Sequence, residues 1–361
     1  MQIVLSVIAF IVVLSVIAIL HEFGHFLTAR GFGVEVEEFG LGFPPKLARL
    51  FTWKGTEFTL NAIPFGAFVR PKGESDPNDK SGLLARSPWV RLSVLLAGPL
   101  SNVVVGWLLF SILFALVGAP NTQVIQVIDV SANSPAQAAG LTAGDQIVAV
   151  DGQTISSTSQ LSSIISQHLG EPLVISVVRN GKVTDVQVTP RAQPPANQGP
   201  VGIVMGNPIE TINLFQAVPY SGRYVGMVIK QFFVLPVQLI TGQIQPQGRV
   251  LVGPVGLFSI FNQAVEPTTS AAGPGTAAPT PIWINLLSLV ANLFVLIGLT
   301  NLLPIPGLDG GQIFLLIPEL VSGKAIPFRL QSAIQMLGLA FLLLLMVYVT
   351  FNDITNPIVL P

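Results

Sequence analysis

The residues best suited to chemistry form one short motif, His21-Glu22-Phe23-Gly24-His25. In an α-helix, residues i and i+4 share one face, so the imidazoles of His21 and His25 can bind one metal ion together. A glutamate between two such histidines is suited to act as a general base on a water activated by that metal. The spacing therefore predicts half of a zinc site that performs hydrolysis.

The surroundings of this motif are unusually apolar. His21 stands nine residues before Arg30, at the end of a long hydrophobic run, and a helix rises roughly 13 Å over that distance. Ionisable residues at such a depth in a membrane are costly and usually functional. The alternative is that they pair within a helix bundle and only fix its packing. Helix packing alone does not require this spacing of two histidines and a glutamate, so we predict a functional site.

Two histidines are too few for a catalytic zinc, which usually takes three protein ligands and a water. The third histidine, His168, falls in a polar region and is interpreted as an ordinary side chain. Besides Glu22, Asp309 is the only acid well inside a predicted membrane segment. It follows Pro304 and Pro306, which break the apolar run, and such backbone is tolerated in a membrane only around a protein-lined cavity. We predict Asp309 as the third ligand; the alternative is a helix N-cap.

The composition as a whole is that of a membrane protein. Half of the 361 residues are hydrophobic and 10% are charged, whereas soluble proteins carry about 25% charged residues. The net charge of −1 gives no long-range attraction for nucleic acid, so no nucleic-acid partner is expected. The absence of cysteine excludes disulfide scaffolds, cysteine-ligated zinc and thiol nucleophiles.

A membrane-crossing helix needs about 20 apolar residues. Four segments meet this requirement, and the first lacks the basic start and the short length of a signal peptide. The sequence therefore predicts a polytopic α-helical membrane protein whose spans are 2–29, 92–117, 282–303 and about 330–351.

A fifth apolar segment, Tyr224–Ile240, has a different character. Its polar residues, including Arg223, Lys230 and Gln238, recur on one helical face. An amphipathic helix lying on the membrane surface is favoured over a fifth span, although the sequence leaves both open.

Basic residues indicate the orientation of the chain. The stretch 30–91 holds nine of the seventeen Lys and Arg residues, and the far longer stretch 118–281 holds six. The positive-inside rule then places 30–91 in the cytoplasm. With four spans, both termini and 118–281 would lie on the outer side.

Four regions are predicted along the chain. Region 1–120 holds two spans, a cytoplasmic loop and a hairpin-like β element at about 57–70. Region 121–191 alternates β-rich runs with turn signals and one helix at 157–168, as an inserted β-rich domain would. Region 192–281 is a linker that contains the surface helix, with Pro- and Gly-rich connectors at 193–200 and 271–281. Region 282–361 carries the last two spans.

The two motifs together resemble the site-2 protease family of intramembrane metalloproteases. The resemblance rests on the HEFGH motif in the first span and on Asn301–Gly311, which reads NLLPIPGLDGG, in the third. It extends to Ala97–Asn102, Ala62–Val69 and Gly253–Gly256, and the stretch 134–152 is similar to the PDZ domains of bacterial members. One departure is Ala67, which stands where a second glycine is common.

This resemblance implies roles for individual residues. Zinc would be held by His21, His25 and Asp309, with Glu22 as the base. Asn301 would hold the substrate backbone or the developing oxyanion. The segment 62–69 would be a membrane-associated β element whose edge pairs with an unwound substrate helix, exposing the peptide bond in extended form.

The resemblance also implies a setting. The enzyme would work in the bacterial cytoplasmic membrane and cleave transmembrane segments of single-pass proteins, such as anti-sigma factors or signal-peptide remnants, in regulated intramembrane proteolysis. The PDZ-like domain would be extracytoplasmic. It would either bind a peptide or substrate ectodomain by strand addition or exclude intact substrates by size.

A rival interpretation is a membrane scaffold or metal-binding transporter that uses the same ligands. A transporter should show inverted repeats or several intramembrane acids, and the sequence has neither. A pseudoenzyme would usually lack the glutamate, yet Glu22 is present. The sequence therefore predicts a zinc metalloprotease.

Overall fold

The computed structural model describes residues 2–74, 79, 81–195, 198–242, 252–265 and 281–357. It divides into two compact units, one built from the described parts of 1–113, 218–269 and 279–361 and the other from 114–217. The predicted connector 271–281 lies outside the described residues except for Pro281, as do two residues of the connector 193–200.

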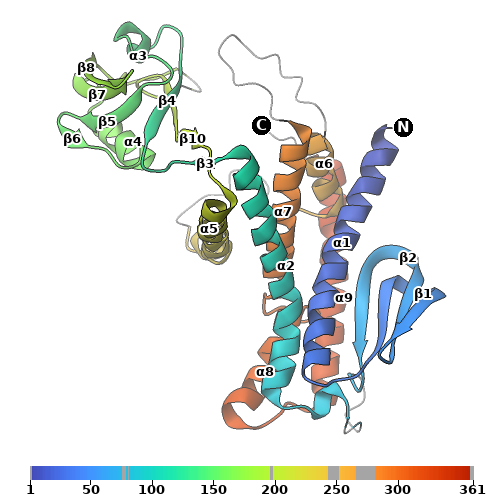
Figure 1. Ribbon diagram of the computed structural model, residues 1–361. Helices are drawn as coiled ribbons and strands as arrows, with labels where there is room; N and C mark the ends of the chain where they lie inside the picture. The colour runs from blue at the N-terminus through green and yellow to red at the C-terminus, as the bar shows by residue number, and fades with distance from the viewer. Residues whose placement is uncertain are drawn as a thin grey trace. The chain divides into compact units, whose positions relative to one another are not determined.

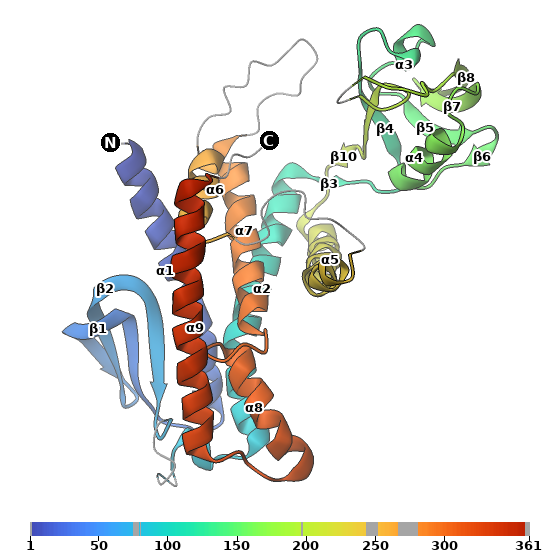
Figure 2. The same ribbon diagram turned by 180° about the vertical axis from the view of Figure 1, so that it is seen from behind.

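The first unit is a helical bundle. Four of its described helices are long and apolar enough to cross a membrane, which confirms four apolar helices where the spans are predicted. They run alongside one another in Figures 1 and 2. The helices are α1 (Gln2–Gly31), α2 (Pro88–Val117), α7 (Ile282–Asn301) and α9 (Phe328–Thr355).

A non-helical stretch separates α7 from the next helix, α8 (Asp309–Ser322). Its backbone is covered by α9. Gly307 donates its N–H to Oε1 of Gln335, and a Cβ at Gly338 would lie 2.2 Å from the carbonyl oxygen of Pro306. The protein thus supplies close packing and a hydrogen-bond partner to backbone that a membrane could not satisfy.

The short helix α6 (Pro254–Val265) sits among the spans. Phe261 of α6 packs against Phe10 of α1 with ring centroids 5.4 Å apart. Its first turn is held from α9, because Oδ2 of Asp353 accepts the N–H of Gly256 at 2.7 Å. A carboxylate at a helix N-terminus satisfies donors that the helix itself leaves free.

The β element is larger than the predicted hairpin at 57–70. Strand β1 (Val36–Trp53) is missing from the sequence prediction, and β2 (Thr56–Pro71) continues through both predicted strands. Phe39 of β1 lies between Phe58 and Val69 of β2, because both strands fold back on themselves. The glycines and the Pro44-Pro45 pair within β1 resemble loop sequence, so the pairing is visible only once the chain is folded.

This β element is anchored on α1 by aromatic packing. Phe26 of α1 lies 5.7 Å from the rings of both Phe39 and Phe58, and these residues share a buried cluster with Val36 and Val69. Among the described residues, the segment 67–71 pairs with one strand, β1. Its opposite edge is turned to α1, because the N–H of Val69 is donated to Glu22.

Helix α5 (Leu214–Ile240) contains the predicted amphipathic segment. Its Ser221 hydroxyl lies 2.7 Å from that of Ser111 on α2, and the rings of Tyr224 and Phe110 are 4.8 Å apart. Figure 1 shows α5 end-on, whereas α2 and α7 are seen from the side. Helix α5 is not among the described helices with the composition of a span, and its position on a membrane surface stays a prediction.

The second unit is built on a sheet with strand order β8-β7-β5-β4-β9. Its core includes fully buried Val127, Leu161 and Ile175. The predicted boundary at 191 excludes β9, which pairs with β4. The elements are β4 (Ile125–Val130), α3 (Pro135–Ala138), β5 (Gln146–Val150), β6 (Gln153–Thr154), α4 (Thr158–Gln167), β7 (Leu173–Arg179), β8 (Lys182–Val188) and β9 (Ile203–Gly206), with the short pair β3 (Ala119–Pro120) and β10 (Ile209–Glu210).

Candidate active site

The structure brings the three predicted ligands together. Nε2 of His21 lies 3.0 Å from Oδ2 of Asp309 and 3.2 Å from Nε2 of His25. Nε2 of His25 lies 3.5 Å from the same carboxylate oxygen. Within the described residues, these three form the group of histidines and acids that could hold a metal ion. The motif on α1 therefore meets the first residue of α8 although His25 and Asp309 lie 284 positions apart in the sequence.

The size of this triangle fits a zinc ion. Zinc binds nitrogen and oxygen ligands at about 2.0–2.1 Å with tetrahedral angles, which separates neighbouring ligand atoms by roughly 3.3 Å. The three observed separations, 3.0, 3.2 and 3.5 Å, bracket that value. Two neutral imidazoles and one carboxylate are also a ligand set that zinc accepts.

Two glycines allow α1 and α2 to approach each other at this site. A Cβ at Gly98 would lie 2.2 Å from Nε2 of His25, and a Cβ at Gly24 would lie 2.4 Å from the carbonyl oxygen of Ala97. No side chain fits at such distances. The helices can bring the histidines against the backbone of α2 only because both positions lack a side chain.

The second nitrogen of each histidine also faces α2. Nδ1 of His25 lies 2.7 Å from the carbonyl oxygen of Val94, and Nδ1 of His21 lies 3.4 Å from Nδ2 of Asn102. Helix α2 thus contacts both imidazoles on the side away from Asp309. Metal-bound histidines usually have such a partner, which fixes the orientation of the ring.

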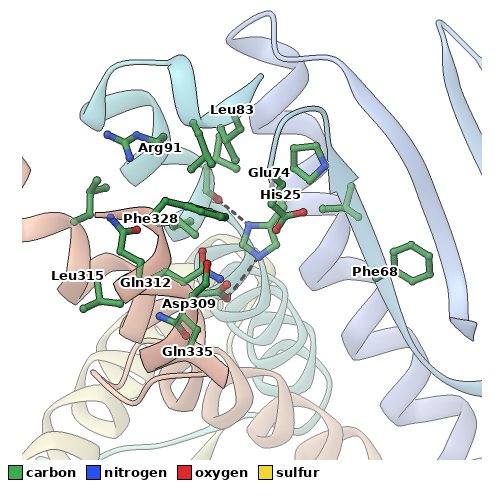
Figure 3. A pocket seen from close by; sticks show the side chains of 18 of the residues that line it. His25, Phe68, Glu74, Leu83, Arg91, Asp309, Gln312, Leu315, Phe328 and Gln335 are labelled. Carbon is green, nitrogen blue, oxygen red and sulfur yellow. Dashed lines mark hydrogen bonds and ion pairs between the residues drawn. The ribbon is translucent and has the colours of Figure 1, made fainter. Parts of the chain in front are cut away.

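Glu22 points to the β element. Its Oε2 accepts the backbone N–H of Val69 at 3.0 Å. Glu22, His25, Asp309 and Val69 line one cavity of about 510 Å³, which Figure 3 shows from close by. The glutamate is therefore held at the wall of a space that also reaches two of the candidate ligands.

The rest of this cavity is partly polar. Gln312 and Gln335 lie near Asp309 in Figure 3, and Arg91 lies farther from it. Arg91 forms an ion pair with Glu319 of α8, in which the two side chains are only 12% and 17% exposed. This pair links the start of α2 to the far end of α8.

Two other residues singled out by the sequence do not join the group. Asn301 ends α7, and its Nδ2 donates to the carbonyl oxygen of Ile297 on the same helix at 3.0 Å. His168 lies in the second unit, with Nδ1 2.9 Å from the carbonyl oxygen of Ile164. The N-cap of α8 is Leu308, and Asp309 follows it as the first helical residue with its side chain turned to the histidines, so the N-cap alternative is wrong.

Sequence reasoning missed the contribution of α2 to the site. Gly98 and Asn102 stand in the stretch Ala97–Asn102, to which the sequence assigns no role at the metal. A buried asparagine inside an apolar span was a usable signal, because polar groups there need a partner. The carbonyl of Val94 and the N–H of Val69 carry no such signal, since every residue has these groups.

A family model and several relatives of known name match nearly the whole chain. A model of the family described as peptidase family M50 matches residues 9–345. The chain is similar to the zinc metalloprotease RasP of Geobacillus kaustophilus, with 28% identity over 97% of each chain. It is also similar to the metalloprotease MmpA of Caulobacter vibrioides, with 28% identity over 98% of this chain and 96% of MmpA. A protein of Clostridium perfringens is 32% identical over 99% of this chain and 100% of its own length.

Solved structures match a smaller part. The PDZ domain of an SdrC-like protein from Listeria monocytogenes is 23% identical and covers 23% of this chain and 87% of its own, with a TM-score of 0.21. A solution structure from Geobacillus thermodenitrificans is 28% identical and covers 23% of this chain and 92% of its own, with a TM-score of 0.19.

Proposed function

The chain belongs to peptidase family M50, and from this premise we propose that it is a zinc metalloprotease that cleaves transmembrane segments of other membrane proteins. The observation that supports this most directly is the meeting of His21, His25 and Asp309 inside a bundle of span-like helices. Relatives that carry the name zinc metalloprotease over nearly the full length support the metal.

In this proposal His21, His25 and Asp309 hold the zinc. When bound there, the ion polarises the substrate carbonyl and lowers the pKa of a bound water. The neutral imidazoles supply lone pairs from Nε2, and the carboxylate of Asp309 supplies the negative charge. Helix α8 carries Asp309 at its first position, so the packing of α8 decides where the third ligand lies.

Glu22 moves the proton. As the water oxygen adds to the carbonyl carbon, the carboxylate of Glu22 takes one proton from that water. The carbon–nitrogen bond then breaks, and Glu22 delivers the proton to the leaving amine. The N–H of Val69 orients the carboxylate by donating to Oε2 at 3.0 Å, while its other oxygen serves the reaction.

The edge of β2 is proposed to bind the substrate. The Val69 N–H that reaches Glu22 points away from β1, so the edge of segment 67–71 opposite β1 lies beside the base. An extended peptide added to this edge would run along the cavity wall formed by Phe68, Val69 and Pro71. Asn301 would assist by hydrogen bonding to the substrate backbone or the oxyanion, which requires its amide to leave Ile297.

The β1–β2 element is proposed to sit against the membrane. It exposes large apolar side chains that water would not favour, and such patches mark interaction surfaces. They are Phe43, Leu47, Phe51, Ile63 and Phe65. In the membrane the element would meet a substrate helix at the depth of the active site.

The proposed setting is the cytoplasmic membrane of a bacterium, where the chain spans the bilayer several times and acts in regulated intramembrane proteolysis. The second unit, as a PDZ-like domain, would lie outside and either bind a substrate ectodomain or exclude large ones. Substrates would be single-pass proteins such as anti-sigma factors or signal-peptide remnants.

The substitution Glu22→Gln tests this function. It keeps the shape of the side chain and removes the base, so cleavage of a single-pass substrate in proteoliposomes should fall by at least about 100-fold, within the range of general-base effects. Zinc content, measured by mass spectrometry of the purified protein, should stay the same. Retained cleavage would refute the mechanism, and a wild-type chain that binds zinc but cleaves no membrane substrate would favour the scaffold or transporter interpretation.

A further inference from the structure

The buried amide of Asn102 stands out among the polar groups near the site. Asn102 lies in the middle of α2 and is 0% exposed. Its Nδ2 is 3.4 Å from Nδ1 of His21, while its Oδ1 has no hydrogen-bond partner among the described residues. An unpaired buried polar atom costs free energy and is rarely left without a reason.

The two histidines differ in the partner that α2 offers them. The carbonyl oxygen of Val94 can only accept, so His25 must carry its proton on Nδ1, and its Nε2 is free to bind a metal. Asn102 has both an acceptor and a donor. It can therefore pair with either tautomer of the neutral His21 ring. The amide oxygen accepts from a protonated Nδ1, and the amide N–H donates to an unprotonated Nδ1.

The orientation of the Asn102 amide and the tautomer of the His21 ring are linked. If Nδ2 of Asn102 donates to Nδ1 of His21, the ring proton sits on Nε2 and can be donated to Asp309, 3.0 Å away. Zinc binding requires the opposite form, with a lone pair on Nε2 and a proton on Nδ1. A half-turn of the amide then presents Oδ1 as the acceptor for that proton.

We propose that Asn102 is a positioning residue for the zinc site, whose carbonyl oxygen accepts the Nδ1 proton of His21 when the metal is bound. This rests on the proposed function and adds a residue that acts through His21. The amide holds the ring in the form that binds zinc, as partners of ligating histidines do elsewhere.

Zinc affinity, measured by chelator competition on the full chain in detergent, tests the proposal independently of cleavage. Asn102→Leu removes both polar ends at similar volume and should weaken zinc binding by about 10–100-fold. Asn102→Asp keeps an acceptor and should stay within a few-fold of the wild type. The matched control is Ser111→Ala, which removes another buried hydrogen bond of α2 away from the site and should leave the affinity unchanged.

The outcomes separate the possibilities. Equal losses in Asn102→Leu and Asn102→Asp would show a packing role and overturn the proposal, as would an Asn102→Leu variant with wild-type affinity. The visible spectrum of the Co²⁺-loaded protein should change in Asn102→Leu but not in Ser111→Ala. A wild-type chain that binds no zinc would overturn the proposed function as well, whereas normal wild-type binding with an unaffected Asn102→Leu would refute this inference alone.

Discussion

At the scale of residues, the site depends on small groups as much as on its ligands. His21 and His25 follow from helical spacing, but their rings are held between α2 and Asp309 by contacts of 2.7–3.5 Å. Gly98 is the clearest case, because the space that a Cβ would need is already filled by the ring of His25.

Gly98→Ala should therefore damage the metal site. The added methyl group would meet Nε2 of His25 at 2.2 Å, so the ring must move away from its metal-binding position. We expect zinc affinity to fall by at least about 10-fold, the lower end of the loss seen when a ligand's orientation is disturbed. Gly226→Ala in α5 is the matched control, because a Cβ there meets nothing within 4 Å. Equal zinc affinity in both variants would contradict the close-approach argument.

At the scale of elements, α2 and α8 place the ligands that α1 cannot supply. Helix α2 contacts both histidines, and α8 presents Asp309 at its first residue. The ion pair between Arg91 and Glu319 joins these helices at the end of α8 that is remote from Asp309. Helix α8 is therefore connected to α1 through Asp309 at its start and to α2 through Glu319 near its end.

Breaking this ion pair should destabilise the bundle. Arg91→Ala leaves the largely buried Glu319 without its partner, which typically costs about 3–5 kcal/mol. The free energy of unfolding in detergent should fall by that amount, and zinc affinity should fall with it because α8 is less constrained.

The exposed pair Lys46–Glu57 provides the control. Its side chains are 42% and 40% exposed, and such pairs contribute about 0–1 kcal/mol. Glu57→Gln should thus have little effect on either measurement. The double reversal Arg91→Glu with Glu319→Arg should recover part of the loss, and a complete failure to do so would argue against a specific ion pair.

A different ion pair governs the second unit. Asp145 is buried, and hydrogen bonds from Arg179 hold its pKa below its usual range. The pKa of an aspartate in the unfolded chain is about 3.9. When folding lowers that pKa, the carboxylate stabilises the folded state at pH values above about 3.9, and this stabilisation is lost as the pH falls through the pKa of the folded state. The unit should therefore lose stability below about pH 4.

Hydrogen exchange of β5 and β7 in the full chain in nanodiscs can measure this. Arg179→Ala should reduce protection at neutral pH by about 1–3 kcal/mol and flatten the acid dependence. Asp129→Asn alters an exposed acid on β4 and serves as the control. An acid dependence that is identical in Arg179→Ala and the wild type would exclude Asp145 as its source.

At the scale of the whole molecule, the orientation in the membrane decides which side delivers substrates. The proposal places 30–91 in the cytoplasm and the second unit outside, because of the distribution of basic residues. The arrangement matters for function, since an outer domain can act on a substrate ectodomain before its membrane segment reaches the metal.

Single cysteines can test the orientation cleanly, because the chain contains none. Ala143→Cys, in an exposed turn of the second unit, should react with an impermeant maleimide in intact cells. Ala85→Cys, at an exposed position that precedes α2 in the chain, should react only after the membrane is permeabilised. The reverse labelling pattern would invert the proposed topology.

The features that could be predicted from the sequence are those that depend on local repetition. The helical spacing of His21 and His25 and the lengths of the four apolar spans are properties of short segments, and so is the prolyl break before Asp309. Helix α4 also agrees with the predicted helix 157–168 to within one residue at each end, because it too depends on the pattern of one short segment.

The contacts that join these segments could not be predicted, because they form only in the folded protein. The approach of Gly98 to His25, the contacts of Asn102 and Val94, and the pairing of Val69 with Glu22 each bring together residues 47–81 positions apart. Strand β1 became visible only through its partners in β2. These contacts depend on long-range packing. Backbone amides occur at every residue and a single glycine has no periodicity, so neither can be recognised from a sequence pattern. His21, Glu22 and His25 identify the chemistry, but α2, α8 and the edge of β2 complete the geometry for it.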